Sequence, residues 1–150
     1  MNLSQLFEEV SQLRLDVDGE ALSGLSNEAP RLAEEACRDI GIDCVNLMTE
    51  LLRRVGRGPI DSNYWKYMAY VDLMLAPRPI NSQILLVIWS RILTAASRLG
   101  CRAVSELGKL ATASMLLAMN IYMAVFSEST GANWDLMDTI VDSATNELIT

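Results

Sequence analysis

Apolar residues recur at steps of three and four along nearly every segment of this chain, which is the period of an α-helix. The stretch from about residue 27 to residue 55 shows this best, with apolar side chains at Leu32, Ala33, Ala36, Cys37, Ile40, Cys44, Leu47, Met48, Leu51, Leu52 and Val55. No segment alternates as a half-buried strand would. Since 51% of the 150 residues are apolar, enough for one core, we expect a single all-α domain over 1–150.

Turn residues divide this pattern into helices. The expected helices span about 2–14, 27–55, 62–75, 82–100, 104–126 and 134–148, with Gly58-Pro59, Pro77 and Pro79 among the breaks and Asp61 or Ser62 as a cap of the third. The helices 82–100 and 104–126 are apolar on most sides, so we expect a central hairpin surrounded by amphipathic helices. The charge-free stretch 79–90 is too short to span a membrane, and Thr112, Ser114 and Asn120 interrupt the stretch 110–127, so we favour burial in a protein core over membrane spans.

Charge and composition exclude several functions. The chain carries 12 basic and 19 acidic residues, a net charge of −7, which argues against binding to nucleic acid or to anionic lipid. It has no histidine, the commonest general base and a usual ligand of catalytic zinc. The carboxylates show no spacing typical of an acid–base pair. We therefore expect a binding protein without a cofactor or metal, and not an enzyme.

The cysteines and the two ends of the chain bear on its compartment. Cys37, Cys44 and Cys101 are odd in number, and we expect free core thiols in a reducing compartment in preference to a disulfide or a metal site. The first ten residues lack the basic start and apolar run of a secretory signal, and the last are polar and acidic. The sequence thus predicts an intracellular, cytoplasmic protein without a C-terminal membrane anchor.

Two short motifs resemble homology motifs of the Bcl-2 family. The run 37–44 on the second expected helix resembles the third motif (BH3), with Gly41 at its small position, Ile42 in place of the usual Asp, and Cys37 and Cys44 in place of larger apolar residues. The run 131–137, Gly-Ala-Asn-Trp-Asp-Leu-Met, resembles the second motif (BH2), in which Trp134 and Asp135 open a short C-terminal helix.

The first motif (BH1), Asn-Trp-Gly-Arg in the family, has two candidate positions. Residues 88–91 keep Trp89 and Arg91 but have Ile88 and Ser90 in place of Asn and Gly, whereas residues 81–84 keep only the Asn. We favour the Trp89 position, because Arg91 then precedes Trp134 by nearly the family's usual distance.

The resemblance implies a Bcl-2-like bundle that holds the BH3 helix of a pro-death protein in an apolar groove and so inhibits apoptosis. It is closest in kind to compact virus-encoded survival proteins, such as those of iridoviruses, acting in the host cell and reaching mitochondria through partners. Bim is the expected ligand, with Bid, Puma, Bak and Bax as others, and Arg91 would pair with the ligand's Asp. The implied groove residues are Cys44, Met48, Leu51, Leu52, Val55, Val71, Leu75, Ile88, Arg91, Thr94, Ala95 and Arg98.

Other interpretations stay open at this point. The same apolar residues are spaced as any core face would be, and Trp89 and Trp134 suit packing as well as ligand contact. A membrane-permeabilising effector of the same fold would use the hairpin over about 82–126. An unrelated helical adaptor or structural protein would share the periodicity without binding BH3 helices. The sequence does not choose between a monomer and a homodimer.

Overall fold

A computed structural model describes residues 3–41, 43–75, 81–130, 139 and 142–147 of the chain. Every secondary-structure element in these ranges is helical: α1 (Leu3–Val10), α2 (Leu25–Cys37), α3 (Val45–Arg57), α4 (Ser62–Leu75), α5 (Asn81–Ala96), a 3₁₀ turn (Ser97–Leu99) and α6 (Cys101–Thr130). Residues 142–147 are also helical and exposed. The all-α class predicted from the periodicity is confirmed.

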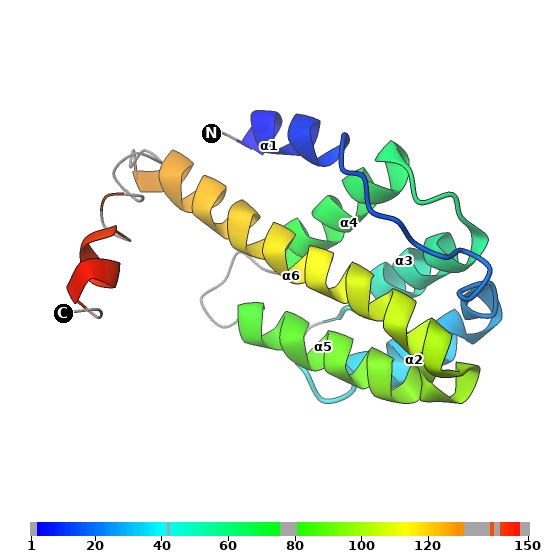
Figure 1. The fold of residues 1–150 in the computed structure, drawn as a ribbon. Helices are drawn as coiled ribbons and strands as arrows, with labels where there is room; N and C mark the ends of the chain where they lie inside the picture. The colour runs from blue at the N-terminus through cyan, green and yellow to red at the C-terminus, as the bar shows by residue number, and fades with distance from the viewer. Residues whose placement is uncertain (1–2, 42, 76–80, 131–138, 140–141, 148–150) are drawn as a thin grey trace.

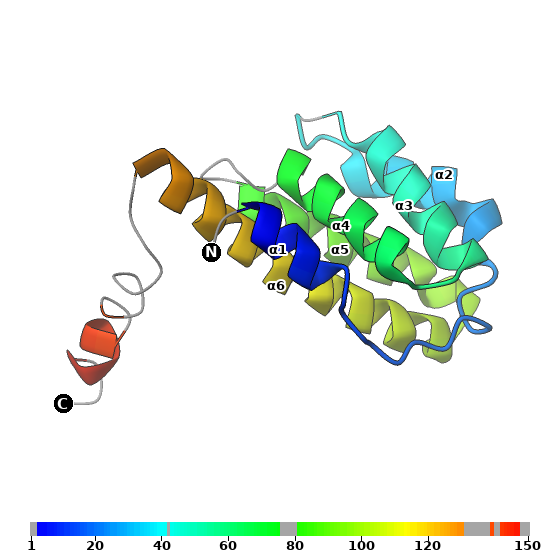
Figure 2. The same ribbon diagram turned by 90° about the horizontal axis from the view of Figure 1, so that it is seen from above.

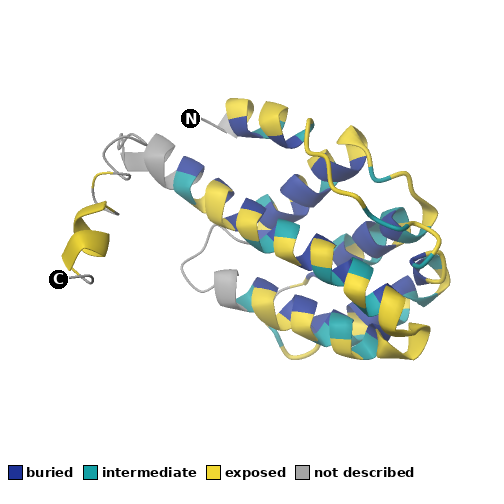
Figure 3. Ribbon diagram, viewed as in Figure 1, coloured by how far each residue is buried: buried dark blue, intermediate teal, exposed yellow. Residues whose placement is uncertain are grey.

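Helices α5 and α6 form an antiparallel hairpin; α1, α2 and α4 pack on it, and α3 packs on α2 and α4 (Figure 1). Figure 2 shows α2 and α3 side by side, while α4 and α1 lie along α6. The hairpin is covered on one side only: Leu86 on α5 and Leu116 and Met119 on α6 are about 60% exposed, and exposed positions repeat along the outer faces of both helices (Figure 3). The expectation of a hairpin surrounded by other helices therefore holds for its inner side alone.

The segment predicted as one long helix over 27–55 is a helical hairpin. Helix α2 ends at Cys37 and α3 begins at Val45, so most of the run that resembles the third motif lies in the connection and the expectation that it is helical is wrong. Two residues of the connection explain the break. Asp39 (φ 58°) and Gly41 (φ 78°) adopt left-handed conformations, which glycine takes at no steric cost and aspartate tolerates better than most residues.

A disulfide bond joins Cys37 and Cys44 across this connection, with their Cα atoms 5.9 Å apart. The expectation of free thiols is therefore wrong for these two residues, while Cys101 is free and exposed. The turn brings the end of α2 back to the start of α3, and that proximity is what allows the bond. Spacing alone did not predict it because seven residues along a straight helix separate two side chains by about 10 Å.

The end of α3 and the start of α4 agree with the boundaries predicted from the sequence. The Asp61 carboxylate accepts a hydrogen bond from the backbone N–H of Tyr64 (3.1 Å) and so caps α4. Gly58, with a φ of 61°, follows the last residue of α3 and donates its N–H to the carbonyl of Arg54 (2.9 Å). Pro30 lies in the second turn of α2, which begins at Leu25, and it removes one intrahelical hydrogen bond.

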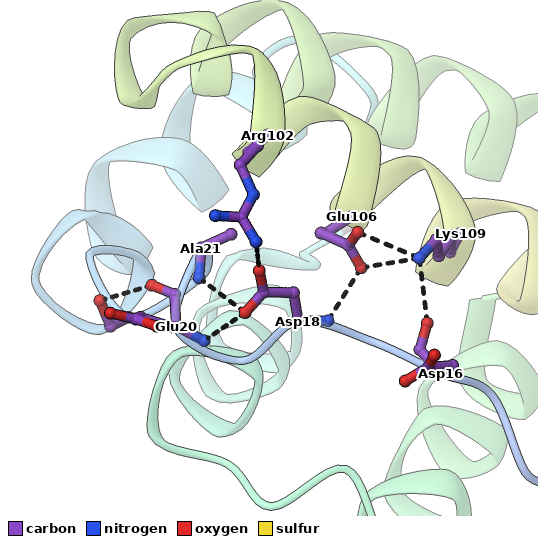
Figure 4. Close-up of polar contacts among 8 residues, drawn as sticks. Asp16, Asp18, Glu20, Ala21, Arg102, Glu106 and Lys109 are labelled. Atoms are coloured by element: carbon purple, nitrogen blue, oxygen red, sulfur yellow. Dashed lines mark hydrogen bonds and ion pairs between the residues drawn. The ribbon is translucent and has the colours of Figure 1, made fainter.

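The long loop before α2 is attached to the first turns of α6 (Figure 4). Glu106 accepts a hydrogen bond from the backbone N–H of Asp18 (2.9 Å), Lys109 donates to the carbonyl of Asp16 (3.0 Å), and Arg102 pairs with the Asp18 carboxylate. The three α6 residues recur at helical spacing on one face. The charged groups of this cluster therefore fasten the loop to the bundle.

Candidate helix-binding site

Most of the predicted groove residues lie in the protein core. Cys44 and the α3 residues Met48, Leu51, Leu52 and Val55, together with Val71 and Leu75 of α4 and Ile88 of α5, are each at most 1% exposed. They belong to one continuous apolar cluster. These side chains therefore line no open groove in this structure, because another element of the chain covers them.

Helix α2 covers the inward surfaces of α3 and α5. It packs extensively against both, whereas α3 and α5 make few contacts with each other, and α4 packs against both of them. Its inward residues recur at helical spacing and are completely buried: Leu25, Ala29, Leu32, Ala33 and Ala36. An amphipathic helix of the chain itself thus lies between the two elements to which most of the predicted groove residues belong (Figures 1 and 2).

Arg91 on α5 contacts the C-terminal end of α2. Its half-buried guanidinium donates hydrogen bonds to the backbone carbonyls of Ala36 (3.2 Å) and Arg38 (2.5 Å). Carbonyls at the end of a helix have no intrahelical partner and carry the negative end of the helix dipole, so a cation is favourable there. In the described structure Arg91 therefore binds a helix end from the same chain.

The other predicted groove residues, Thr94, Ala95 and Arg98, lie at or near the surface beside α2. Arg98 is an exposed residue whose guanidinium lies 3.6 Å from the Glu35 carboxylate of α2. Thr94 and Ala95 line a shallow hollow of about 350 Å³, and its full lining is Glu35, Arg38, Ser90, Arg91, Thr94 and Ala95. Two arginines, Arg38 and Arg91, and one glutamate line this hollow, which makes it a suitable place for a carboxylate of a bound ligand.

The structure describes Trp89 and Gly41 of the homology-like motifs but not the two residues of the second motif. Trp89 is 2% exposed, in agreement with a packing residue, and its indole N–H has no hydrogen-bond partner among the described residues. Gly41 lies in the α2–α3 connection and not on a helix face. Trp134 and Asp135 lie outside the described residues.

A buried polar pair joins α4 to α6. The Ser114 hydroxyl donates a hydrogen bond to one carboxylate oxygen of Asp72 (2.8 Å), and both residues are 0% exposed. Burial raises the pKa of the Asp72 carboxyl well above its usual value, although the hydrogen bond from Ser114 lowers that pKa in part. Burial also raises the pKa of Tyr64 on the same helix, and the charge of Asp72 adds to this rise.

A second hollow, apolar and about 420 Å³ in volume, was not predicted from the sequence. It lies between α1, α4 and α6 and is lined mainly by Leu6, Val10, Leu13, Leu15, Trp65, Ala113, Leu116 and Leu117. The signal for it was the continuation of apolar residues at Leu13 and Leu15 beyond the end of α1. In addition, α6 contains one stretch, Cys101–Ala124, that is long and apolar enough to cross a membrane; 44% of its most apolar window is buried in the bundle.

Comparisons with protein-family models, with curated proteins and with solved structures find no match to this chain. The described residues contain no group of three or more His, Cys, Asp or Glu side chains placed to hold a metal ion.

Proposed function

We propose that this protein binds the BH3 helix of a pro-death protein on the surface formed by α3 and α5, and thereby inhibits apoptosis. What supports the proposal is that this surface already holds an amphipathic helix, α2, by burial of one apolar face. A surface that holds α2 in this way is suited to a ligand helix with anchors at similar spacing. Arg91 lies at the edge of the surface, where a ligand carboxylate would replace the carbonyls that it now binds.

The chemistry of the surface suggests its selectivity. Met48 is unbranched and polarisable, so it adapts to ligand side chains of different shape. Ile88 and Ser90 replace the Asn and Gly of the first motif, and an apolar side chain at position 88 cannot hydrogen-bond a polar group of the ligand. We expect a narrower range of BH3 ligands than a host survival protein has, with Bim as the first candidate.

Calorimetric titration with BH3 peptides of Bim, Bid, Puma, Bak and Bax tests the proposal. Arg91→Glu should weaken the binding of the preferred peptide about tenfold to a hundredfold, because it replaces a charge-assisted hydrogen bond by repulsion. Arg53→Glu is the matched control: it makes the same charge change at an exposed position of α3 and should leave the affinity nearly unchanged. Absence of binding across the panel, with helicity intact by circular dichroism, would contradict the proposal.

A second candidate function, permeabilisation of membranes, is favoured by one observation: the outer face of α6 exposes Leu116, Met119 and Tyr122 within the stretch that is long enough to span a bilayer. Leakage of a dye from liposomes distinguishes the two candidates. A survival protein should bind BH3 peptides without causing leakage, whereas an effector should release the dye.

A further inference from the structure

Helix α2 is fitted closely onto α3 at both of its ends. At its start, Gly56 of α3 lies so near that a Cβ atom there would be 2.5 Å from the backbone nitrogen and the hydroxyl oxygen of Ser26. At its end, the disulfide between Cys37 and Cys44 joins the last residue of α2 to the residue that immediately precedes α3. The position of α2 on α3 therefore depends on one glycine and one covalent bond.

The contacts of α2 with α5 are of the kind expected from a bound ligand helix. Arg91 binds the carbonyls at the C-terminal end of α2, and Arg98 pairs with the carboxylate of Glu35. Both arginines belong to the set that the motif resemblance assigns to ligand binding. In this structure α2 thus satisfies the two basic groups that a ligand acid would otherwise meet.

Helix α2 is nevertheless a weak helix with a small apolar face. Three of the inward residues, Ala29, Ala33 and Ala36, are alanines, so α2 buries less apolar area per turn than a helix with large anchors would. Pro30 removes an intrahelical hydrogen bond, and no side chain caps the N-terminus of α2. These features make α2 displaceable by a ligand helix that carries larger apolar side chains.

We infer that α2 is a built-in competitor that occupies the BH3-binding surface of α3 and α5 and must leave it before a ligand helix binds. The inference rests on the proposed function and concerns the regulation of the same surface. The Cys37–Cys44 bond keeps the displaced helix close, and a tethered competitor has a high effective concentration. Only molecules in which α2 has left the surface can bind a BH3 helix. The apparent affinity is therefore the intrinsic affinity multiplied by the fraction of such molecules.

Gly56→Ala tests the inference directly, because the added methyl group collides with the backbone of α2 and moves its first turn off α3. Gly108→Ala is the matched control, since it makes the same change inside α6 at a position with no neighbouring atom within 4 Å of the new Cβ. We expect Gly56→Ala to raise the affinity for a Bim BH3 peptide about tenfold or more, and Gly108→Ala to leave it unchanged. Cys37→Ser is a second variant: it opens the disulfide and leaves α2 connected to α3 only through the longer main-chain segment 38–44, so it should raise the affinity in the same direction.

A synthetic peptide of residues 25–37 separates the failure of this inference from that of the proposed function. The inference predicts that this peptide binds Gly56→Ala and competes there with the Bim peptide. If the peptide binds Gly56→Ala and no BH3 peptide does, α2 is the occupant of the surface and the proposed function is wrong. If wild type, Gly56→Ala and Cys37→Ser bind Bim equally and the peptide does not compete, the proposed function stands and the inference is overturned. Binding of neither peptide to any variant overturns both.

Discussion

Asp72→Asn should change the dependence of stability on pH in a direction that the buried pair dictates. Burial raises the pKa of this carboxyl in the folded protein well above its ordinary value of 3.8. Between those two pKa values the folded state holds a proton that the unfolded state has lost, so the free energy of unfolding falls as pH rises. One such proton corresponds to a slope of about −1.4 kcal/mol per pH unit.

Asparagine has no proton to release, so the variant lacks this contribution. The stability of Asp72→Asn minus that of wild type should therefore rise by about 1.4 kcal/mol per pH unit above about pH 4 and become level once the folded-state pKa is passed. The amide oxygen can still accept the hydrogen bond from Ser114, which limits other effects of the change.

Urea unfolding followed by circular dichroism, at a series of pH values from about 4 to about 8, gives the free energies needed. Asp43→Asn, an aspartate-to-asparagine change at an exposed position of the α2–α3 connection, controls for the substitution itself. A difference between Asp72→Asn and wild type that stays constant over this range would refute the reasoning from burial.

Two further predictions concern single features of the fold. Reduction of the disulfide between Cys37 and Cys44 should lower the free energy of unfolding by about 2.5 kcal/mol, the loop-closure value for about eight residues, and so lower Tm by about 5–10 °C; equal melting curves with and without dithiothreitol would show that the bond adds no stability. Asp61→Ala removes the cap of the Tyr64 N–H and should cost about 1 kcal/mol; calorimetry that finds Tm unchanged would contradict a stabilising role for that hydrogen bond.

Local signals in the sequence were sufficient to predict where α3 ends and where α4 begins. Gly58 ends α3 and Asp61 caps α4 as expected, since both act through the backbone within one turn. The break after Cys37 was not predictable in the same way. Apolar periodicity continues through Ile40 and Cys44, and the turn depends on left-handed conformations at two residues that the sequence also allows in a helix.

The candidate site shows a second limit of prediction from sequence: spacing does not reveal which element covers an apolar face. A groove and a core use the same three- and four-residue spacing, so periodicity selected Met48, Leu51 and Leu52 correctly as inward-facing but could not tell what covers them. The covering element is α2, and its place depends on contacts between segments far apart in the chain, such as Arg91 with Ala36. Gly56 was missed because a glycine near a helix end reads as a stop signal and carries no sign of a close approach.

The disulfide between Cys37 and Cys44 also reports the topology of this part of the chain, because it can form only when α2 and α3 are arranged as a hairpin. In one continuous helix these residues would stand two turns apart on the same face, about 10 Å from each other, too far for a disulfide. The oxidised chain is therefore committed to the α2–α3 hairpin, whereas a straight helix over the same residues requires two thiols. Mass spectrometry after thiol alkylation, without prior reduction, would thus identify the oxidised molecules, all of which have the hairpin topology.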